Sequence, residues 1–230
     1  MGHIINNYIL LTAKSWHDNL FDYLQTRPNE VWTRIKIKED FNIEKINALN
    51  PVKIFIPHWS YIISKEIFES YSCIVFHMTD LPFGRGGSPL QNLIIRGITE
   101  TKISAIKVNK GIDTGDIYLK ENLLLEGTAT RVFERAVPII QSMIEKIIED
   151  KIEPQPQIGE PVFFKRRKPE DSNIKALQEL NEVYNYIRML DCEGYPNAFI
   201  ETENLKIDFT NAQLNSTENY ITANVRIIKK

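Results

Sequence analysis

The residues best suited to chemistry lie in the stretch VFHMTDLPFGRGGSP at positions 75 to 89. His77 can accept or donate a proton near neutral pH, so it is a candidate general acid or base. In the loop that follows, two prolines restrict the backbone and three glycines allow it to approach a ligand closely. A histidine at the end of a buried strand can equally be a hydrogen-bonded core residue, so His77 alone does not establish catalysis.

A carboxylate that could assist this histidine lies in GIDTGDI at positions 111 to 117, where Asp113 is followed by Thr114 and Gly115. A carboxylate close to an imidazole fixes its tautomer and stabilises its protonated form. Aspartate between glycines is also a common turn-forming residue. The spacing of the two motifs leaves both interpretations of Asp113 open.

Alternating strand and helix patterns surround these loops. Apolar runs predict strands at 8–13, 33–38, 52–57, 72–76, 102–108 and 116–125. Helical spacing predicts helices at 15–25, 88–97 and 130–150, the first with a capping box from Ser15 and Asp18 and the last kinked or delayed by Pro138. This alternation favours an α/β fold with a mostly parallel sheet, whose ligands bind beyond the carboxyl ends of the strands.

The chain changes character after residue 153. PQPQIGEP at 154–161 has the composition of a linker, and a helix at 173–190 and strands at 198–201, 205–209 and 221–228 follow it. We therefore predict a main domain at 1–165 and a small α+β domain at 166–230.

The composition restricts the function. The chain has 28 Lys+Arg and 30 Asp+Glu with a formal net charge of -2, which gives no general electrostatic reason to bind nucleic acid. The basic run KRRK at 165–168 is compatible with a solvated linker. The spacing of Cys73 and Cys192 fits no metal site, and the start MGHIINNYILLTA resembles neither a signal peptide nor a membrane span. We expect a cytoplasmic protein without a structural metal, and the sequence leaves its oligomeric state open.

The two motifs together, HMTDLPFGRGGSP and GIDTGDI, resemble the signature of the folate-dependent formyltransferases. The resemblance extends to PHWSYIISKEIF, FFKRRKPEDSNI and VYNYIRMLDCEGYPNAFI, and so covers most of the chain. It implies a Rossmann-like formyltransferase fold with a small C-terminal appendage. It also implies transfer of a formyl group from 10-formyltetrahydrofolate to a primary amine.

The resemblance also assigns roles. His77 would handle the amine proton and Asp113 would orient it. The folate would contact Ser60, Tyr61, Ile62, Ile63, Leu81, Lys110, Gly111 and Asp113. The amine substrate would contact Trp16, His17, His58, Trp59, Thr79, Phe83, Arg85, Gly86, Gly87 and Gln91. Arg85 could instead brace its own loop, and the tryptophans could be packing residues.

One position departs from the family. Val75 occupies the place, two residues before the histidine, where the family has an asparagine that is thought to bind the formyl oxygen. Losing one such donor typically costs about a hundredfold in rate. We expect another donor, either protonated His77 or one of His58, Ser60 and Asn92. The alternative is a catalytically inactive homologue that binds folate or a partner.

The acceptor is predicted from finer similarity. PHWS with HMTDLPFGRGGSPLQNL is most similar to the N-formyltransferases of pseudaminic-acid-type sugars. Together with the slightly acidic charge, this favours a nucleotide-linked, UDP-bound 4-amino-4,6-dideoxy sugar and no nucleic-acid partner. The alternative acceptors are methionyl-tRNA and an amino acid on a peptide synthetase.

Overall fold

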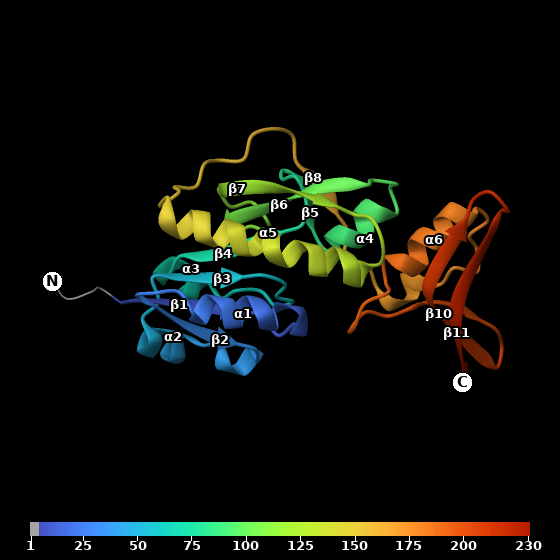
Figure 1. Cartoon of the computed structure of the whole chain (residues 1–230), viewed down its shortest axis with the longest axis horizontal. Helices are drawn as coiled ribbons and strands as arrows, with labels where there is room; N and C mark the ends of the chain where they lie inside the picture. Colours follow the sequence, from blue (N-terminus) through green and yellow to red (C-terminus); the bar gives the residue numbers. More distant parts are fainter. Residues whose placement is uncertain (1–4) are drawn as a thin grey trace. The chain divides into compact units, whose positions relative to one another are not determined.

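A computed structural model describes residues 5–230 of the chain (Figure 1). The expectation about the start of the chain falls partly on residues 1–4, which lie outside this range. By their contacts the described residues form two compact units. The first unit comprises residues up to 85, 102–122 and 134–163, and the second comprises 86–101, 123–133 and 164–230. The second unit therefore takes in two segments from before the predicted boundary at residue 165.

A six-stranded sheet in the order β2-β1-β3-β4-β6-β7 is the main element of the fold. Its strands are β1 (Asn6–Leu11), β2 (Glu30–Ile35), β3 (Lys53–Ile56), β4 (Cys73–His77), β6 (Glu100–Lys107) and β7 (Ile117–Leu124). Strands β2, β1, β3 and β4 pair in parallel, while β6 runs antiparallel to β4. The predicted α/β fold with a mostly parallel sheet is confirmed.

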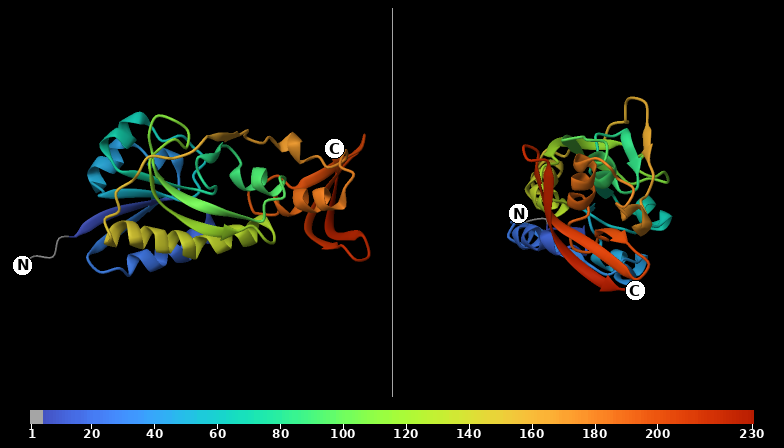
Figure 2. Two further views of the ribbon diagram at one scale, coloured as in Figure 1. Left: turned by 90° about the horizontal axis from the view of Figure 1, so that it is seen from above. Right: turned by 90° about the vertical axis from the view of Figure 1, so that its right-hand side faces the viewer.

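Helices connect and cover the strands (Figure 2). They are α1 (Asp18–Gln25), α2 (Ile43–Leu49), α3 (Lys65–Ser70), α4 (Pro89–Ile94), α5 (Ala129–Glu149) and α6 (Leu180–Arg188), with short 3-10 turns η1 (Ser15–His17), η2 (Lys38–Asp40) and η3 (Pro169–Ser172). Helix α5 continues through Pro138. The expected capping box at Ser15 is absent, because no side-chain cap forms there and Asp18 instead pairs with Arg34 at 2.5 Å.

Alternation along the strands determines what packs on one face of the sheet. Ile9, Ile54, Ile56 and Cys73 form an apolar cluster with Ile46 of α2 and Ile67 of α3. Val75 packs against this cluster. Because side chains two residues apart on a strand share a face, the side chain of His77 lies on the same face as that of Val75.

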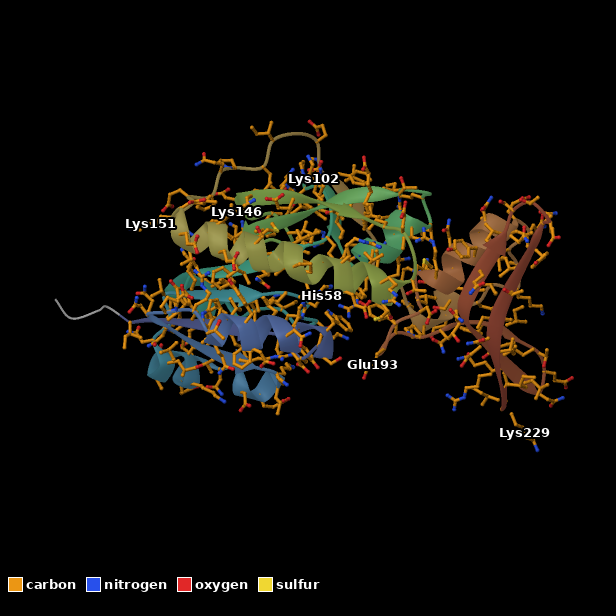
Figure 3. The ribbon with its side chains drawn as sticks, in the orientation of Figure 1. His58, Lys102, Lys146, Lys151, Glu193 and Lys229 are labelled. Atoms are coloured by element: carbon orange, nitrogen blue, oxygen red, sulfur yellow. The ribbon has the colours of Figure 1, made fainter. Side chains whose placement is uncertain are left out.

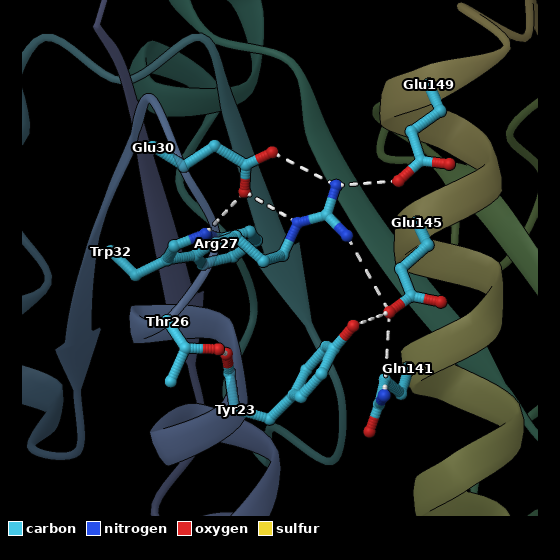
Figure 4. Close-up of polar contacts among 8 residues, drawn as sticks. All are labelled: Tyr23, Thr26, Arg27, Glu30, Trp32, Gln141, Glu145 and Glu149. Atoms are coloured by element: carbon cyan, nitrogen blue, oxygen red, sulfur yellow. Dashed lines mark hydrogen bonds and ion pairs between the residues drawn. The ribbon is translucent and has the colours of Figure 1, made fainter.

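An ionic network links the α1 edge of the sheet to α5 within the first unit (Figure 4). Arg27 donates from Nε to Glu30 at 2.9 Å and from Nη2 to Glu149 at 2.9 Å. Tyr23 donates its hydroxyl to Glu145 at 2.6 Å. These bonds raise the pKa of Arg27, chiefly through Glu30, so the network fixes the edge of the sheet that faces α5.

The second unit contains an antiparallel sheet in the order β11-β10-β9, formed by β9 (Ala198–Glu201), β10 (Leu205–Asn215) and β11 (Tyr220–Lys229). Helix α6 contacts β10 and β11. This helix is shorter than predicted because Ile174 donates its backbone N–H to Phe199 at 2.9 Å, which keeps the preceding chain extended. Two further short strands, β5 (Phe83–Gly86) and β8 (Val162–Phe164), pair with each other.

Both cysteines, Cys73 and Cys192, are free and buried. Burial raises the pKa of the Cys73 thiol to about 12, so this sulfur is an unreactive core atom. Over residues 5–230, no helix combines the length and the apolar character needed to cross a bilayer.

Candidate active site

His77 ends β4 at the carboxyl edge of the parallel strands, where the sequence predicts the site. Its side chain is only 8% exposed. Nε2 lies 2.8 Å from the carbonyl oxygen of Gly84, and Nδ1 lies 3.6 Å from Oδ1 of Asp113. The structure thus brings the two predicted catalytic residues together.

The partners of His77 define the work of its two nitrogens. A carbonyl oxygen only accepts hydrogen bonds, so Nε2 carries a proton when it bonds to Gly84. A proton on Nδ1 would point to the Asp113 carboxylate, which stabilises the imidazolium that forms when the ring takes up a second proton. The ring is therefore oriented from both sides and suited to acid–base chemistry.

The turn that carries Asp113 is shaped by small side chains. Asn109 Oδ1 accepts hydrogen bonds from the Gly111 N–H at 2.9 Å and the Thr114 hydroxyl at 2.8 Å. Asp113 itself has a left-handed φ of 53°. A Cβ at Gly115 would lie 1.6 Å from the Lys107 carbonyl oxygen, so only glycine fits there. This local structure presents the Asp113 carboxylate to His77.

The loop after His77 is held by strands β6 and β7. Ser104 donates its hydroxyl to the Thr79 carbonyl at 2.7 Å and accepts the Leu81 N–H at 3.3 Å. Lys120 donates to the Leu81 carbonyl and, at 2.5 Å, to Asp80. Burial would raise the pKa of Asp80, yet hydrogen bonds from Lys120 and from Lys102 (Figure 3) lower it overall. The predicted contacts Thr79 and Leu81 are buried, so their side chains serve packing and their backbone supports the loop.

Arg85 braces the loop in this structure. Its Nε and Nη2 donate to the Gln157 side-chain oxygen at 3.1 and 2.8 Å, and its guanidinium lies 6.0 Å from the centre of the Phe163 ring. This matches the second of the two roles predicted for Arg85. Phe83, also a predicted contact, is half-buried in the same strand.

The other predicted residues of the glycine loop belong to the second unit. A Cβ at Gly86 would lie 2.4 Å from the Phe164 carbonyl oxygen, and one at Gly87 would lie 2.5 Å from Cβ of Arg166. Gln91 is buried and donates to the Met189 carbonyl at 3.2 Å. These glycines therefore allow close chain packing, and the Gln91 amide holds α4 to the end of α6.

Asn92, a suggested replacement for the missing family asparagine, has its amide committed inside the second unit. Its Nδ2 lies 3.0 Å from each of three carbonyl oxygens, those of Gly87, Ser88 and Lys165. An amide nitrogen has two hydrogens, and these three acceptors use both. Asn92 therefore has no hydrogen left for a formyl oxygen.

Four predicted substrate contacts form an aromatic cluster beyond β1 and β3. The rings of His17 and His58 are 5.3 Å apart, and Trp16 meets His58 edge-on at 5.7 Å (Figure 3 labels His58). Trp59 instead contacts Phe41 and Tyr61. His17 is fully buried and bonds through Nδ1 to the Thr12 hydroxyl at 2.9 Å, so it shapes this region from beneath.

Burial keeps both of these histidines neutral. It lowers the pKa of His58 to about 3, with a smaller contribution from Lys14. Burial also lowers the pKa of His17 to about 2, with smaller contributions from the charges of His58, Arg34 and Lys14. The proton chemistry of the site therefore falls to His77, because the other two imidazoles do not titrate near neutral pH.

The predicted folate contacts form two exposed segments. Tyr61 is 51% exposed, Ile62 is 91% exposed and Ile112 is 67% exposed, whereas Ile63 belongs to the core. Ser60 and Lys110 are also exposed, and Gly111 is partly so. Exposed apolar side chains beside free-running backbone suit a flat heteroaromatic ring with a hydrogen-bonding edge, so these residues fit a pterin.

Sequence analysis missed three residues that shape the site: Ser104, Lys120 and Gln157. Each acts on a loop far away in sequence, and no local motif marks them. Among residues 5–230, no group of three or more His, Cys, Asp or Glu side chains is arranged to hold a metal ion.

Comparison with known proteins places the chain in a family. Residues 14–136, which include the whole His77–Asp113 site, match the family described as formyl transferase. The chain belongs to the formyltransferase family. Residues 169–228 match the family described as methionyl-tRNA formyltransferase, C-terminal domain. The sequence-based assignment to folate-dependent formyltransferases is confirmed at this level, and the family's formyl donor is 10-formyltetrahydrofolate.

Similar proteins carry one name repeatedly. A structure of methionyl-tRNA formyltransferase from Clostridium thermocellum is 49% identical, with a TM-score of 0.95 over 98% of this chain and 100% of that one. The methionyl-tRNA formyltransferase of Thermodesulfovibrio yellowstonii is 29% identical over 75% of this chain and 58% of its own length. This chain spans about three fifths of the length of such curated relatives.

These findings correct the predicted acceptor. The formyltransferase PseJ from Anoxybacillus kamchatkensis, solved with a UDP-sugar, is 19% identical with a TM-score of 0.60, which shows a shared fold alone. The prediction of a nucleotide-sugar acceptor was wrong, and so was the expectation of no nucleic-acid partner. The reason is physical: the His77 and Asp113 motifs encode formyl transfer, which every family member performs, and they do not encode the acceptor.

Proposed function

We propose that this protein transfers the formyl group of 10-formyltetrahydrofolate to the amino group of methionyl-tRNA. The observation that carries the proposal is the 49% identity to the Clostridium thermocellum methionyl-tRNA formyltransferase over the full length of both chains. The match of residues 169–228 to the C-terminal domain of that enzyme class supports the same acceptor.

The geometry around His77 supports a role in proton transfer. 10-Formyltetrahydrofolate supplies the formyl carbon, and the acceptor nitrogen must lose a proton as it bonds to that carbon. Nδ1 faces Asp113, so Nε2 is the nitrogen available to receive this proton. The amine competes with the Gly84 carbonyl for Nε2, which lies 2.8 Å from that carbonyl. Asp113 then stabilises the imidazolium.

Val75 shapes the other half of the reaction. It packs against the apolar cluster of the sheet and offers no hydrogen bond to the formyl oxygen. The protonated ring of His77 is the donor that we assign to this oxygen, because Asn92 is committed elsewhere. In this scheme one residue receives the proton and supplies the charge that stabilises the oxygen.

The proposal is tested with in vitro charged methionyl-tRNA and 10-formyltetrahydrofolate. After base hydrolysis of the ester, mass spectrometry should detect N-formylmethionine. Free methionine and N-acetylmethionyl-tRNA serve as controls, because the first lacks the tRNA and the second lacks a free amine. Formylation of free methionine at the same rate as methionyl-tRNA would overturn the assigned acceptor.

Two variants of one turn test the assigned residues. Asp113→Asn should lower kcat by about a hundredfold or more, because it removes the charge that stabilises the imidazolium. The matched control is Asp116→Asn, an exposed carboxylate three positions along the chain that should leave kcat within twofold. A parent protein that binds folate but formylates none of the acceptors would instead be the inactive homologue.

A further inference from the structure

Gln157 lies in the Pro-rich segment 154–161, which the sequence predicts to be a linker, yet its side chain is fully engaged. Its Oε1 accepts two hydrogen bonds from Arg85, at 3.1 and 2.8 Å. Its Nε2 donates to the carbonyl oxygens of Asp113 and Gly115, each at 2.8 Å. One amide thus joins the glycine loop after His77 to the turn that carries Asp113.

The identity of the four partners fixes the orientation of this amide. Arginine only donates hydrogen bonds and backbone carbonyls only accept them, so the oxygen of Gln157 must face Arg85 and its nitrogen must face the turn. Both amide hydrogens are used. A glutamate in this place could keep the two bonds from Arg85 but could donate nothing to the turn.

Backbone bonds on either side hold Gln157 in position. Gln155 and Ile117 exchange two N–H to carbonyl bonds, at 2.7 and 2.8 Å, beside the Asp113 turn. Val162 donates its N–H to the Pro82 carbonyl at 3.2 Å beside the glycine loop. The segment is therefore attached at both ends to the two loops that Gln157 connects.

The turn needs such support because of its backbone. Asp113 has a φ of 53°, a conformation that costs energy for a residue with a side chain. Gln157 clamps the carbonyl of this same residue, and the carboxylate on that backbone lies 3.6 Å from Nδ1 of His77. Any shift of the turn moves the carboxylate relative to the imidazole.

We propose that Gln157, anchored by Arg85, is a positioning residue that sets the Asp113 carboxylate against His77. The effect on turnover rests on the proposed function, whereas the effect on the geometry of the imidazole does not. The segment predicted to be a linker is thus part of the active-site support, although Gln157 itself touches no reacting atom.

The test compares Gln157→Glu with Gln155→Glu. Gln155 is the same residue type in the same segment, and its side chain is exposed. Gln157→Glu should lower kcat by about tenfold to a hundredfold, because small misplacements of catalytic groups cost this much, while KM for both substrates stays within twofold. Gln155→Glu should leave both constants within twofold. A purely structural role would lower the melting temperature and leave kcat per folded molecule unchanged.

A substrate-free measurement separates this inference from the proposed function. The imidazole ¹⁵N signals of His77, assigned by their loss in His77→Asn, should shift in Gln157→Glu and stay in place in Gln155→Glu. If the parent enzyme formylates no acceptor but these signals shift, the positioning role holds and the proposed function fails. If neither kcat nor the signals change, the positioning role is overturned.

A second variant guards against misfolding of Gln157→Glu. Arg85→Met removes both donors to the Gln157 oxygen while keeping an aliphatic chain beside Phe163. The freed amide should shift the His77 ring signals in the same direction by a smaller amount. Unchanged signals in folded Arg85→Met would contradict the anchoring role of Arg85.

Discussion

Mild acid should destabilise the first unit through His17 and His58. Burial lowers the pKa of His17 to about 2 and that of His58 to about 3, so both stay neutral in the folded protein well below pH 5. In the unfolded chain each titrates near its ordinary pKa of about 6.5. The unfolded state therefore binds more protons between these limits, and stability falls as the pH drops below about 6.5.

The size of this effect follows from the two pKa values. A histidine that is protonated only when unfolded costs the folded state about 2 kcal/mol between pH 7 and pH 5. For His17 and His58 together the loss is about 4 kcal/mol, a large part of the roughly 5–15 kcal/mol that stabilises a typical domain. Carboxylates such as Asp80, whose pKa is lowered by Lys120 and Lys102 against the effect of burial, lose their contribution only at lower pH.

Urea unfolding at pH 7 and pH 5, followed by tryptophan fluorescence, measures this loss. All three tryptophans lie in the first unit, so the signal reports on the unit that holds both histidines. The comparison is a His17→Asn, His58→Asn double variant. Asparagine can keep the bond of His17 to Thr12 and tolerates the left-handed φ of 55° at His58. Equal losses of stability in parent and double variant would refute the reasoning.

Three further outcomes are expected. Val75→Asn should lower the unfolding free energy by about 1–3 kcal/mol in urea titrations, because it places an amide in an apolar cluster, and an unchanged value would show that this position faces polar surroundings. Lys120→Met should cost about 1 kcal/mol by the same method, since it removes the donor to Leu81 and Asp80; no loss would remove Lys120 from the loop support. Lys165→Glu with Lys168→Glu, both exposed, should weaken methionyl-tRNA binding and reduce its log–log salt slope by about one per phosphate contact, and the parent slope in the variant would place the tRNA elsewhere.

Much of the sheet could be predicted because its information is local. Apolar runs such as 52–57 and 72–76 are too short for buried helices and are separated by helical patterns, which leaves a parallel sheet as the arrangement that buries them. The placement of His77 and the Asp113 turn at one sheet edge follows from the same rule. Helix α2 and strands β5 and β8 were not predicted, because each is short and is formed mainly through contacts with distant segments.

The support of the site could not be predicted for a related reason. Gln157 is 72 residues from Arg85 and 44 from Asp113, and nothing in PQPQIGEP distinguishes a clamp from a linker. The functions of Gly86 and Gly87 were also hidden. A glycine that admits a ligand and one that admits a neighbouring carbonyl look the same in sequence, and the Phe164 carbonyl 2.4 Å from a Cβ on Gly86 decides for packing there.

The acceptor was the main error, and its origin is instructive. Similarity within HMTDLPFGRGGSP favoured sugar enzymes, and the net charge of -2 argued against nucleic acid. A formal charge sums over the whole surface and says nothing about a local run such as 165–168, whose Lys165, Arg166 and Lys168 are exposed. Similarity over the full length of the chain carried the information that one loop could not.

The most direct test of this account is the single-turnover rate of methionyl-tRNA formylation by the parent protein and by His77→Ala. Saturating 10-formyltetrahydrofolate and excess protein isolate the formyl-transfer step from product release. The account predicts N-formylmethionyl-tRNA from the parent and a rate at least about a hundredfold lower for His77→Ala with folate binding retained. Equal rates for the two proteins, or no product from the parent, would contradict it.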